Sequence, residues 1–114
     1  MQQEDLQIKE TIEDDIHLIK AIGDLIITNA DALQKRIDKA LNEGAINITL
    51  DFLEIQYIDS FGIGVIVKTK ADIDKKRGRL RVMLNDSLYS LFQKCHLDEY
   101  IDLETPGKSD DEDI

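Results

Sequence analysis

One stretch decides the fold of this 114-residue chain: residues 50–67, which read LDFLEIQYIDSFGIGVIV. It joins an alternating strand pattern (residues 45–52) to an apolar segment that predicts a helix over residues 60–74. The inward positions of the strand are apolar: Ile46, Ile48, Leu50 and Phe52. Residues 53–57 are expected to form the loop between this strand and the helix. A strand that leads into a helix is the repeating unit of α/β folds.

The start of this predicted helix is the most informative site in the chain. Asp59 or Ser60 can supply the oxygen that caps the first helical N–H groups. Gly62 and Gly64 remove side-chain bulk and so allow another group to approach closely. The positive end of a helix also tolerates a phosphate. The residues alone leave two interpretations open: ordinary capping with tight packing, or a site that accepts an anionic group.

Outward from this stretch, strand and helix patterns alternate along the whole chain. Strands are expected at residues 6–12, 16–22, 45–52, 79–84 and 100–103. Helices are expected at residues 30–43 and 60–74, and a third begins after Asn85 or Asp86. The order β-β-α-β-α-β-α-β predicts an α/β fold: a mixed, mostly parallel sheet of about five strands covered by helices, with an antiparallel hairpin at its start.

Local signals add detail to each helix. Asn29 is the expected N-cap of the first helix, and Gly44 follows its end. The second helix is expected to bury its apolar N-terminal half and to expose its charged C-terminal half. Cys95 completes an apolar stripe in the third helix and is expected to be buried.

The charge balance argues against a general nucleic-acid binder, because the chain has 24 acidic and only 14 basic residues and its net charge is −10. Half of the basic residues lie between Lys68 and Arg81. That cluster is either a solvated helix end and turn or a docking patch for an acidic partner. The longest apolar run, residues 61–67, is too short to span a membrane, and the polar first residues indicate no signal peptide. A cytoplasmic location is expected.

The chain contains no pattern that predicts a metal, a cofactor or catalysis. Cys95, His17 and His96 do not make a zinc site, and the two histidines are expected to be structural or surface residues. Ser60 lacks the Gly-x-Ser-x-Gly pattern of a hydrolase nucleophile. The last residues, 104–114, are expected to form an acidic, disordered tail after a single domain over residues 1–103.

From about Leu6 to Leu103 the chain resembles a STAS domain, the fold of bacterial anti-sigma factor antagonists. The order of elements carries this resemblance together with residues 50–67, which are similar to the family's strand, loop, Asp-Ser-x-Gly and helix block. Two further stretches match: RLRVMLNDSLYSLFQKCHL (residues 79–97) and DEYIDL (residues 98–103).

The resemblance implies a partner-switching regulator that is not an enzyme. In such families the serine after the aspartate, here Ser60, is phosphorylated by an anti-sigma factor that is itself a serine kinase. The unphosphorylated antagonist binds that kinase, and a PP2C-type phosphatase resets the switch. No contact with nucleic acid or membrane is implied, and the protein is expected to be a monomer or a weak homo-oligomer. The expected partner-binding residues are Asp59, Phe61, Gly62, Asp24, Thr28 and Asn29.

Two departures from the family pattern bear on the site. Phe61 stands where the family often has Ser, Thr or Ala, and it is either a core residue or an exposed anchor for a partner. The loop after the second strand reads Gly23-Asp24-Leu25-Ile26, where the family usually has Gly-x-hydrophobic-Asp. Alternative functions are a scaffold subunit of a larger sensory assembly, a switch acting on a non-sigma partner, or an enzyme or nucleotide-binding domain in which Ser60 reacts directly.

Overall fold

The computed structural model describes residues 6–106 and confirms the predicted order of strands and helices. The elements are β1 (Gln7–Glu13), β2 (Ile16–Leu25), α1 (Ala30–Asn42), β3 (Asn47–Ile58), α2 (Ser60–Lys75), β4 (Arg79–Leu84), α3 (Asp86–Lys94), the short 3-10 helix η1 (Leu97–Glu99) and β5 (Asp102–Glu104).

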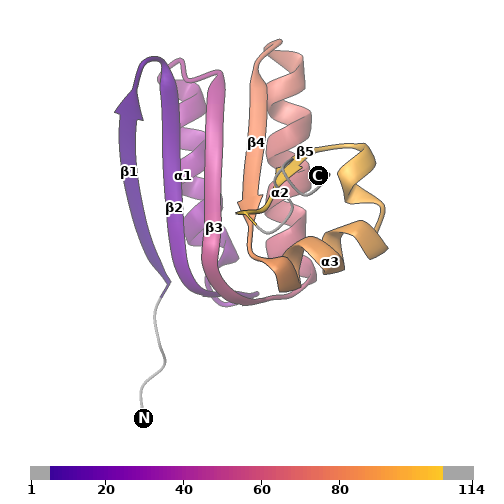
Figure 1. Ribbon diagram of the computed structural model, residues 1–114. Helices are drawn as coiled ribbons and strands as arrows, with labels where there is room; N and C mark the ends of the chain where they lie inside the picture. The colour runs from indigo at the N-terminus through magenta and orange to yellow at the C-terminus, as the bar shows by residue number, and fades with distance from the viewer. Residues whose placement is uncertain (1–5, 107–114) are drawn as a thin grey trace.

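The five strands form one sheet in the order β1-β2-β3-β4-β5 (Figure 1). β1 pairs with β2 in the antiparallel direction, and the three remaining pairs are parallel. Figure 1 shows α1 and α2 behind the sheet, so these two helices cover one of its faces. The carboxyl ends of β2, β3 and β4 therefore meet at one edge, where α1, α2 and α3 begin.

The core lies between the sheet and these two helices. Alternate residues of the central strands are buried there, including Ile19, Leu50 and Val82. They pack into one cluster with Leu33 and Ile37 of α1 and with Ile66 and Ile73 of α2. Burying one such side chain contributes about 1.5–3 kcal/mol.

β3 is longer than the sequence pattern indicated. The loop expected at residues 53–57 is wrong, because β3 continues to Ile58 and stays paired with β2. The pairing includes register shifts between Lys20 and Ile22 and between Gly23 and Asp24. These irregularities break the period-two alternation that identifies a strand in sequence.

The burial of α2 also differs from the expectation. The helix does not bury its N-terminal half alone, since Thr69 and Ile73 are as fully buried as Ile66. The Thr69 hydroxyl donates to the backbone oxygen of Val65 at 2.8 Å, which satisfies its polar group inside the core. α2 thus packs along its length, while Lys68 and Lys75 are exposed and Lys70 lies over the ring of Tyr100.

At the C-terminal side two expectations change. Cys95 is exposed rather than buried, because α3 ends at Lys94 and the apolar stripe ends with it. Glu104 belongs to β5, and Thr105 is buried and donates to the Asp86 carboxylate at 3.2 Å. The fold therefore includes the first residues assigned to the acidic tail; residues 107–114 lie outside the described part of the chain.

Among residues 6–106 there is no helix with the length and apolar character needed to cross a membrane.

Candidate functional site

The start of α2 is capped by Asp59, whose backbone is extended at φ −109° and ψ −173°. Its Oδ1 accepts hydrogen bonds from the backbone N–H groups of Phe61 at 2.9 Å and Gly62 at 3.1 Å. Of the two candidate caps, Asp59 is therefore the one that acts, and Ser60 is the first residue of the helix.

Asp59 also joins α2 to the connection between β2 and α1. Its second oxygen, Oδ2, accepts from the backbone N–H of Ile27 at 3.0 Å, across 32 positions of sequence. Its own N–H donates to the backbone oxygen of Leu25 at 3.2 Å. One carboxylate thus places Ser60 beside the loop that follows β2.

Ser60 is exposed at the N-terminus of α2. Among the residues that the structure describes, none forms a hydrogen bond with its hydroxyl. The hydroxyl is thus available to an enzyme without local unfolding. At this position an added phosphate would meet the positive end of the helix.

The two residues after Ser60 have opposite environments. Phe61 is 54% exposed, which decides against a core role. Gly62 is buried, and a Cβ there would lie 2.6 Å from Ile58 Cγ1 and 2.8 Å from the backbone oxygen of Leu25. Gly62 is predicted to contact a partner, but in the free protein it is buried. Instead its missing side chain lets α2 approach β2 and β3, so it positions the site without forming its surface.

Gly64 does not share this role. A Cβ at Gly64 would meet no atom of residues 6–106 within 4 Å, so no close approach is formed there within the described part of the chain. Of the two glycines in the first turns of α2, only Gly62 is required by packing.

The end of β2 and the loop after it contain the other residues that are predicted to contact a partner. Asp24 and Thr28 are exposed, and Asn29 is half-buried. Asn29 occupies the N-cap position of α1, but its side chain makes no capping hydrogen bond. Its Oδ1 accepts from Ile26 N at 2.9 Å and its Nδ2 donates to the Asp24 backbone oxygen at 2.8 Å. The Asn29 amide is therefore bonded to the backbone of the preceding residues, and the prediction that its side chain caps α1 is wrong.

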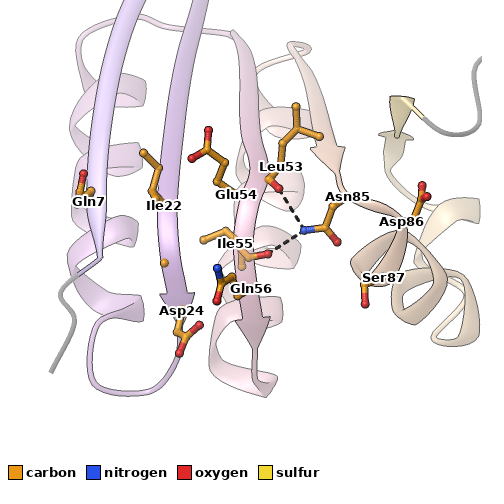
Figure 2. Close-up of a pocket in the computed structure, with 11 residues that line it drawn as sticks. Gln7, Ile22, Asp24, Leu53, Glu54, Ile55, Gln56, Asn85, Asp86 and Ser87 are labelled. Atoms are coloured by element: carbon orange, nitrogen blue, oxygen red, sulfur yellow. Dashed lines mark hydrogen bonds between the residues drawn. The ribbon is translucent and has the colours of Figure 1, made fainter.

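A hollow of about 930 Å³ lies at the same edge of the sheet (Figure 2). It is lined by Gln7, Ile22, Gly23, Asp24, Leu53, Glu54, Ile55, Gln56, Asn85, Asp86 and Ser87. Asn85 joins the start of α3 to β3 at one side of the hollow, because its Nδ2 donates to the backbone oxygens of Leu53 at 3.2 Å and Ile55 at 2.8 Å. Its Oδ1 accepts from Leu88 N at 3.0 Å and caps α3. The sequence indicated the cap but not the hollow, although the common edge of the parallel strands was a signal for it.

The remaining titratable candidates lie elsewhere. His17 is buried, and its Nε2 lies 3.0 Å from Glu10 Oε1. Burial opposes ionisation of Glu10, but hydrogen bonds with His17 and Arg36 outweigh it and hold the pKa of Glu10 below its usual value. The cluster stabilises the β1–β2 hairpin against α1. In residues 6–106 no three His, Cys, Asp or Glu side chains are grouped so that they could hold a metal ion.

Comparisons with known proteins identify the family and the fold. The family model of the STAS domain matches residues 7–109. A candidate anti-sigma factor antagonist of Thermotoga maritima, TM1081, is 27% identical, with 85% of each chain covered and a TM-score of 0.81. An anti-sigma factor antagonist of Mycobacterium paratuberculosis is 16% identical over 88% of this chain and 86% of its own, with a TM-score of 0.81. The phosphorylated form of the Bacillus cell fate determinant SpoIIAA is 19% identical over 96% of this chain and 100% of its own, with a TM-score of 0.69.

Proposed function

This chain belongs to the STAS domain family, and from that premise we propose that it is an anti-sigma factor antagonist controlled by phosphorylation of Ser60. The unphosphorylated protein binds an anti-sigma factor that is also a serine kinase, and phosphorylation releases it. A PP2C-type phosphatase restores the binding form. The protein works in the cytoplasm, by binding rather than by catalysis.

The observation that carries this proposal is the exposed Ser60 hydroxyl at the capped start of α2. Asp59 already satisfies the first N–H groups of the helix, so the fold does not need the serine oxygen. A kinase can therefore modify Ser60 while the domain stays folded. SpoIIAA, which has a similar fold, has itself been solved in a phosphorylated form.

The charges around Ser60 favour a switch that acts at the interface with the partner. The segments that surround it, residues 21–34, 53–67 and 82–93, contain no Lys, Arg or His. They do contain Asp24 and Asp59, next to which a phosphate would add a charge of about −1.5 to −2. Since these segments offer no cation, the phosphate remains a strongly charged group on the docking surface.

A phosphate on Ser60 should affect the free energy of partner binding more than the free energy of folding. The helix terminus stabilises an added anion by about 0.3–1 kcal/mol, so phosphorylation leaves the fold intact. Burying that anion without a partner in an interface costs about 2–5 kcal/mol, or roughly 30- to 5,000-fold in affinity. The interface effect is the larger one, and a single modification is sufficient to release the partner.

The test begins with the Ser60→Ala protein as bait in lysate from the native organism, and the captured kinase is then purified. We expect this variant to bind the kinase and to remain bound when ATP is added, whereas the wild-type protein is phosphorylated and released. Ser90→Ala is the matched control, because Ser90 is also exposed on a helix; it should behave as wild type.

Peptide mass spectrometry of the released protein should place the phosphoryl group on Ser60. The affinity of the phosphorylated protein, measured by calorimetry, should be at least about 30-fold lower than that of the unmodified protein. Equal affinity of the two forms, or release of the Ser60→Ala variant by ATP, would contradict the proposal.

A further inference from the structure

The end of the molecule opposite Ser60 has a surface with no role in the proposed switch. Here the β1–β2 turn, the α1–β3 connection and the α2–β4 turn lie together, at the top of Figure 1. We call Glu13, Asp14 and Asp15 the acidic tip, and Lys75, Lys76 and Arg77 the basic turn.

Both charged groups are exposed and unneutralised. None of their six side chains forms an ion pair with any residue in the range 6–106. The other lysines of α2 form ion pairs. Lys68 Nζ lies 2.7 Å from Asp72 Oδ2, and Lys70 Nζ lies 3.1 Å from Asp74 Oδ1. The chain therefore presents an unpaired positive group and an unpaired negative group at the same end.

Three exposed isoleucines lie at this end: Ile12 and Ile16 next to the acidic tip, and Ile46 between the tip and the basic turn. Ile12 is 70% exposed, Ile16 is 41% exposed and Ile46 is 43% exposed. Ile12, Asp15 and Ile46 line one hollow of about 460 Å³. The hollow connects the acidic tip to Ile12 and Ile46, which we call the apolar centre.

Ile46 also contacts the basic side of this end. Its backbone oxygen accepts from Arg79 N at 2.7 Å, and a Cβ at Gly78 would lie only 2.1 Å from that oxygen. The α2–β4 turn is therefore packed directly against Ile46. Across this end Ile46 therefore separates the acidic tip from the basic turn.

We propose that this end binds a second copy of the same chain in a two-fold symmetric dimer. A two-fold axis near Ile46 brings the acidic tip of each copy against the basic turn of the other, so one contact is formed twice. The three negative charges of each tip then face three positive charges. Because both Ser60 sites lie at the far ends, the dimer leaves them free.

The dimer is a weak one. Its apolar centre consists of Ile12 and Ile46, which line one hollow, and the remaining contacts are exposed charges that salt screens. We expect sedimentation velocity of the full chain to show a monomer–dimer equilibrium that moves to the dimer as the concentration rises toward about 1 mM. Raising the salt from about 0.01 M to about 1 M should favour the monomer, since the screening length falls from about 30 Å to about 3 Å. A wild-type protein that is monomeric throughout this range overturns the proposal.

Charge-altered chains test the symmetry directly. The acid-altered variant carries Glu13→Lys, Asp14→Asn and Asp15→Asn; asparagine suits the positive φ of 49° and 71° at the last two positions. The base-altered variant carries Lys75→Glu and Lys76→Glu. Each variant alone places like charges together, and its dimer dissociation constant should rise at least about tenfold. An equimolar mixture should associate again, because both contacts then join opposite charges. Failure of the mixture to associate overturns the symmetric arrangement.

Ile46→Asp tests the apolar centre. It should weaken the dimer at least about tenfold, while Ile27→Asp, a change of similar exposure at the opposite end, should leave the dimer unchanged. Circular dichroism melting checks that both variants fold. Dimerisation that is lost with Ile27→Asp but retained with Ile46→Asp overturns the assignment of the surface.

Discussion

The starts of α1 and α2 lie next to each other, but the polar residues that precede the two helices form different hydrogen bonds. Asn29 precedes α1 and turns its side chain back into the loop, where it accepts from Ile26 N and donates to the Asp24 backbone oxygen. Asp59 precedes α2 and accepts three backbone N–H groups, two from its own helix and one from Ile27.

This difference follows from the chemistry of the two side chains. An amide carries both a donor and an acceptor, so Asn29 can close a loop within one segment. A carboxylate only accepts, so Asp59 collects N–H groups from two segments. The α2 start is thereby fixed to its neighbour, and the α1 start depends mainly on its own backbone. Substitutions at Gly62, Asp59 and Asn29 test this comparison.

The largest effect is expected for Gly62→Ala, which removes the close approach on which the α2 start depends. The new Cβ would meet the Leu25 backbone oxygen at 2.8 Å, and this atom cannot move aside as a flexible side chain would. We expect the free energy of unfolding, measured by urea denaturation, to fall by about 3 kcal/mol.

Gly64→Ala is the matched control for this change, because its Cβ enters open space in the same helix. It should raise the free energy of unfolding by about 0.5–1 kcal/mol, since alanine costs less entropy than glycine in a helix. If both variants were destabilised alike, helix geometry rather than the contact with Leu25 would explain the loss.

Asp59→Ala should have the next largest effect. It removes the cap and the bond to Ile27 together, at a cost of about 2 kcal/mol in urea denaturation. Asp59→Asn separates the two parts: its oxygen can still cap α2, but its NH₂ faces the N–H of Ile27. A loss of about 1 kcal/mol is expected for this variant. Equal losses for Ala and Asn would show that the bridge to the loop, and not the cap, dominates.

Asn29→Ala should have the smallest effect, about 0.5–1 kcal/mol, because only bonds within its own loop are lost. The helical content, measured by far-ultraviolet circular dichroism, should stay unchanged. A loss as large as that of Asp59→Ala would remove the distinction between the two helix starts.

The sequence predicts the elements of this fold well, because most strands and helices have clear periodic patterns. The order of strands and helices follows from them, whereas the prediction of a site at the start of α2 depends on the family resemblance of residues 50–67. Where the prediction fails, distant residues decide the outcome. β3 continues through residues 53–58 because β2 is present as its partner, through a pairing with shifted register.

The side-chain roles show the same limit. Asn29 has a good N-cap residue type, but the free backbone groups of its loop compete for the amide. Cys95 has the right spacing for the buried stripe, but α3 ends one residue earlier. Phe61 could be placed outside only when α2 was positioned on the sheet. The sequence provides the candidate residues, and the packing decides how they are used.

The bridge from Asp59 to Ile27 has a consequence for the thermodynamics of recognition. Ordering a residue's backbone costs about 1–2 kcal/mol, which flexible loops lose from their binding free energy when they dock. Here the loop after β2 is already held to α2 in the free protein. A protein that docks beside Ser60 therefore meets a preorganised surface, and more of the energy of its contacts remains as affinity.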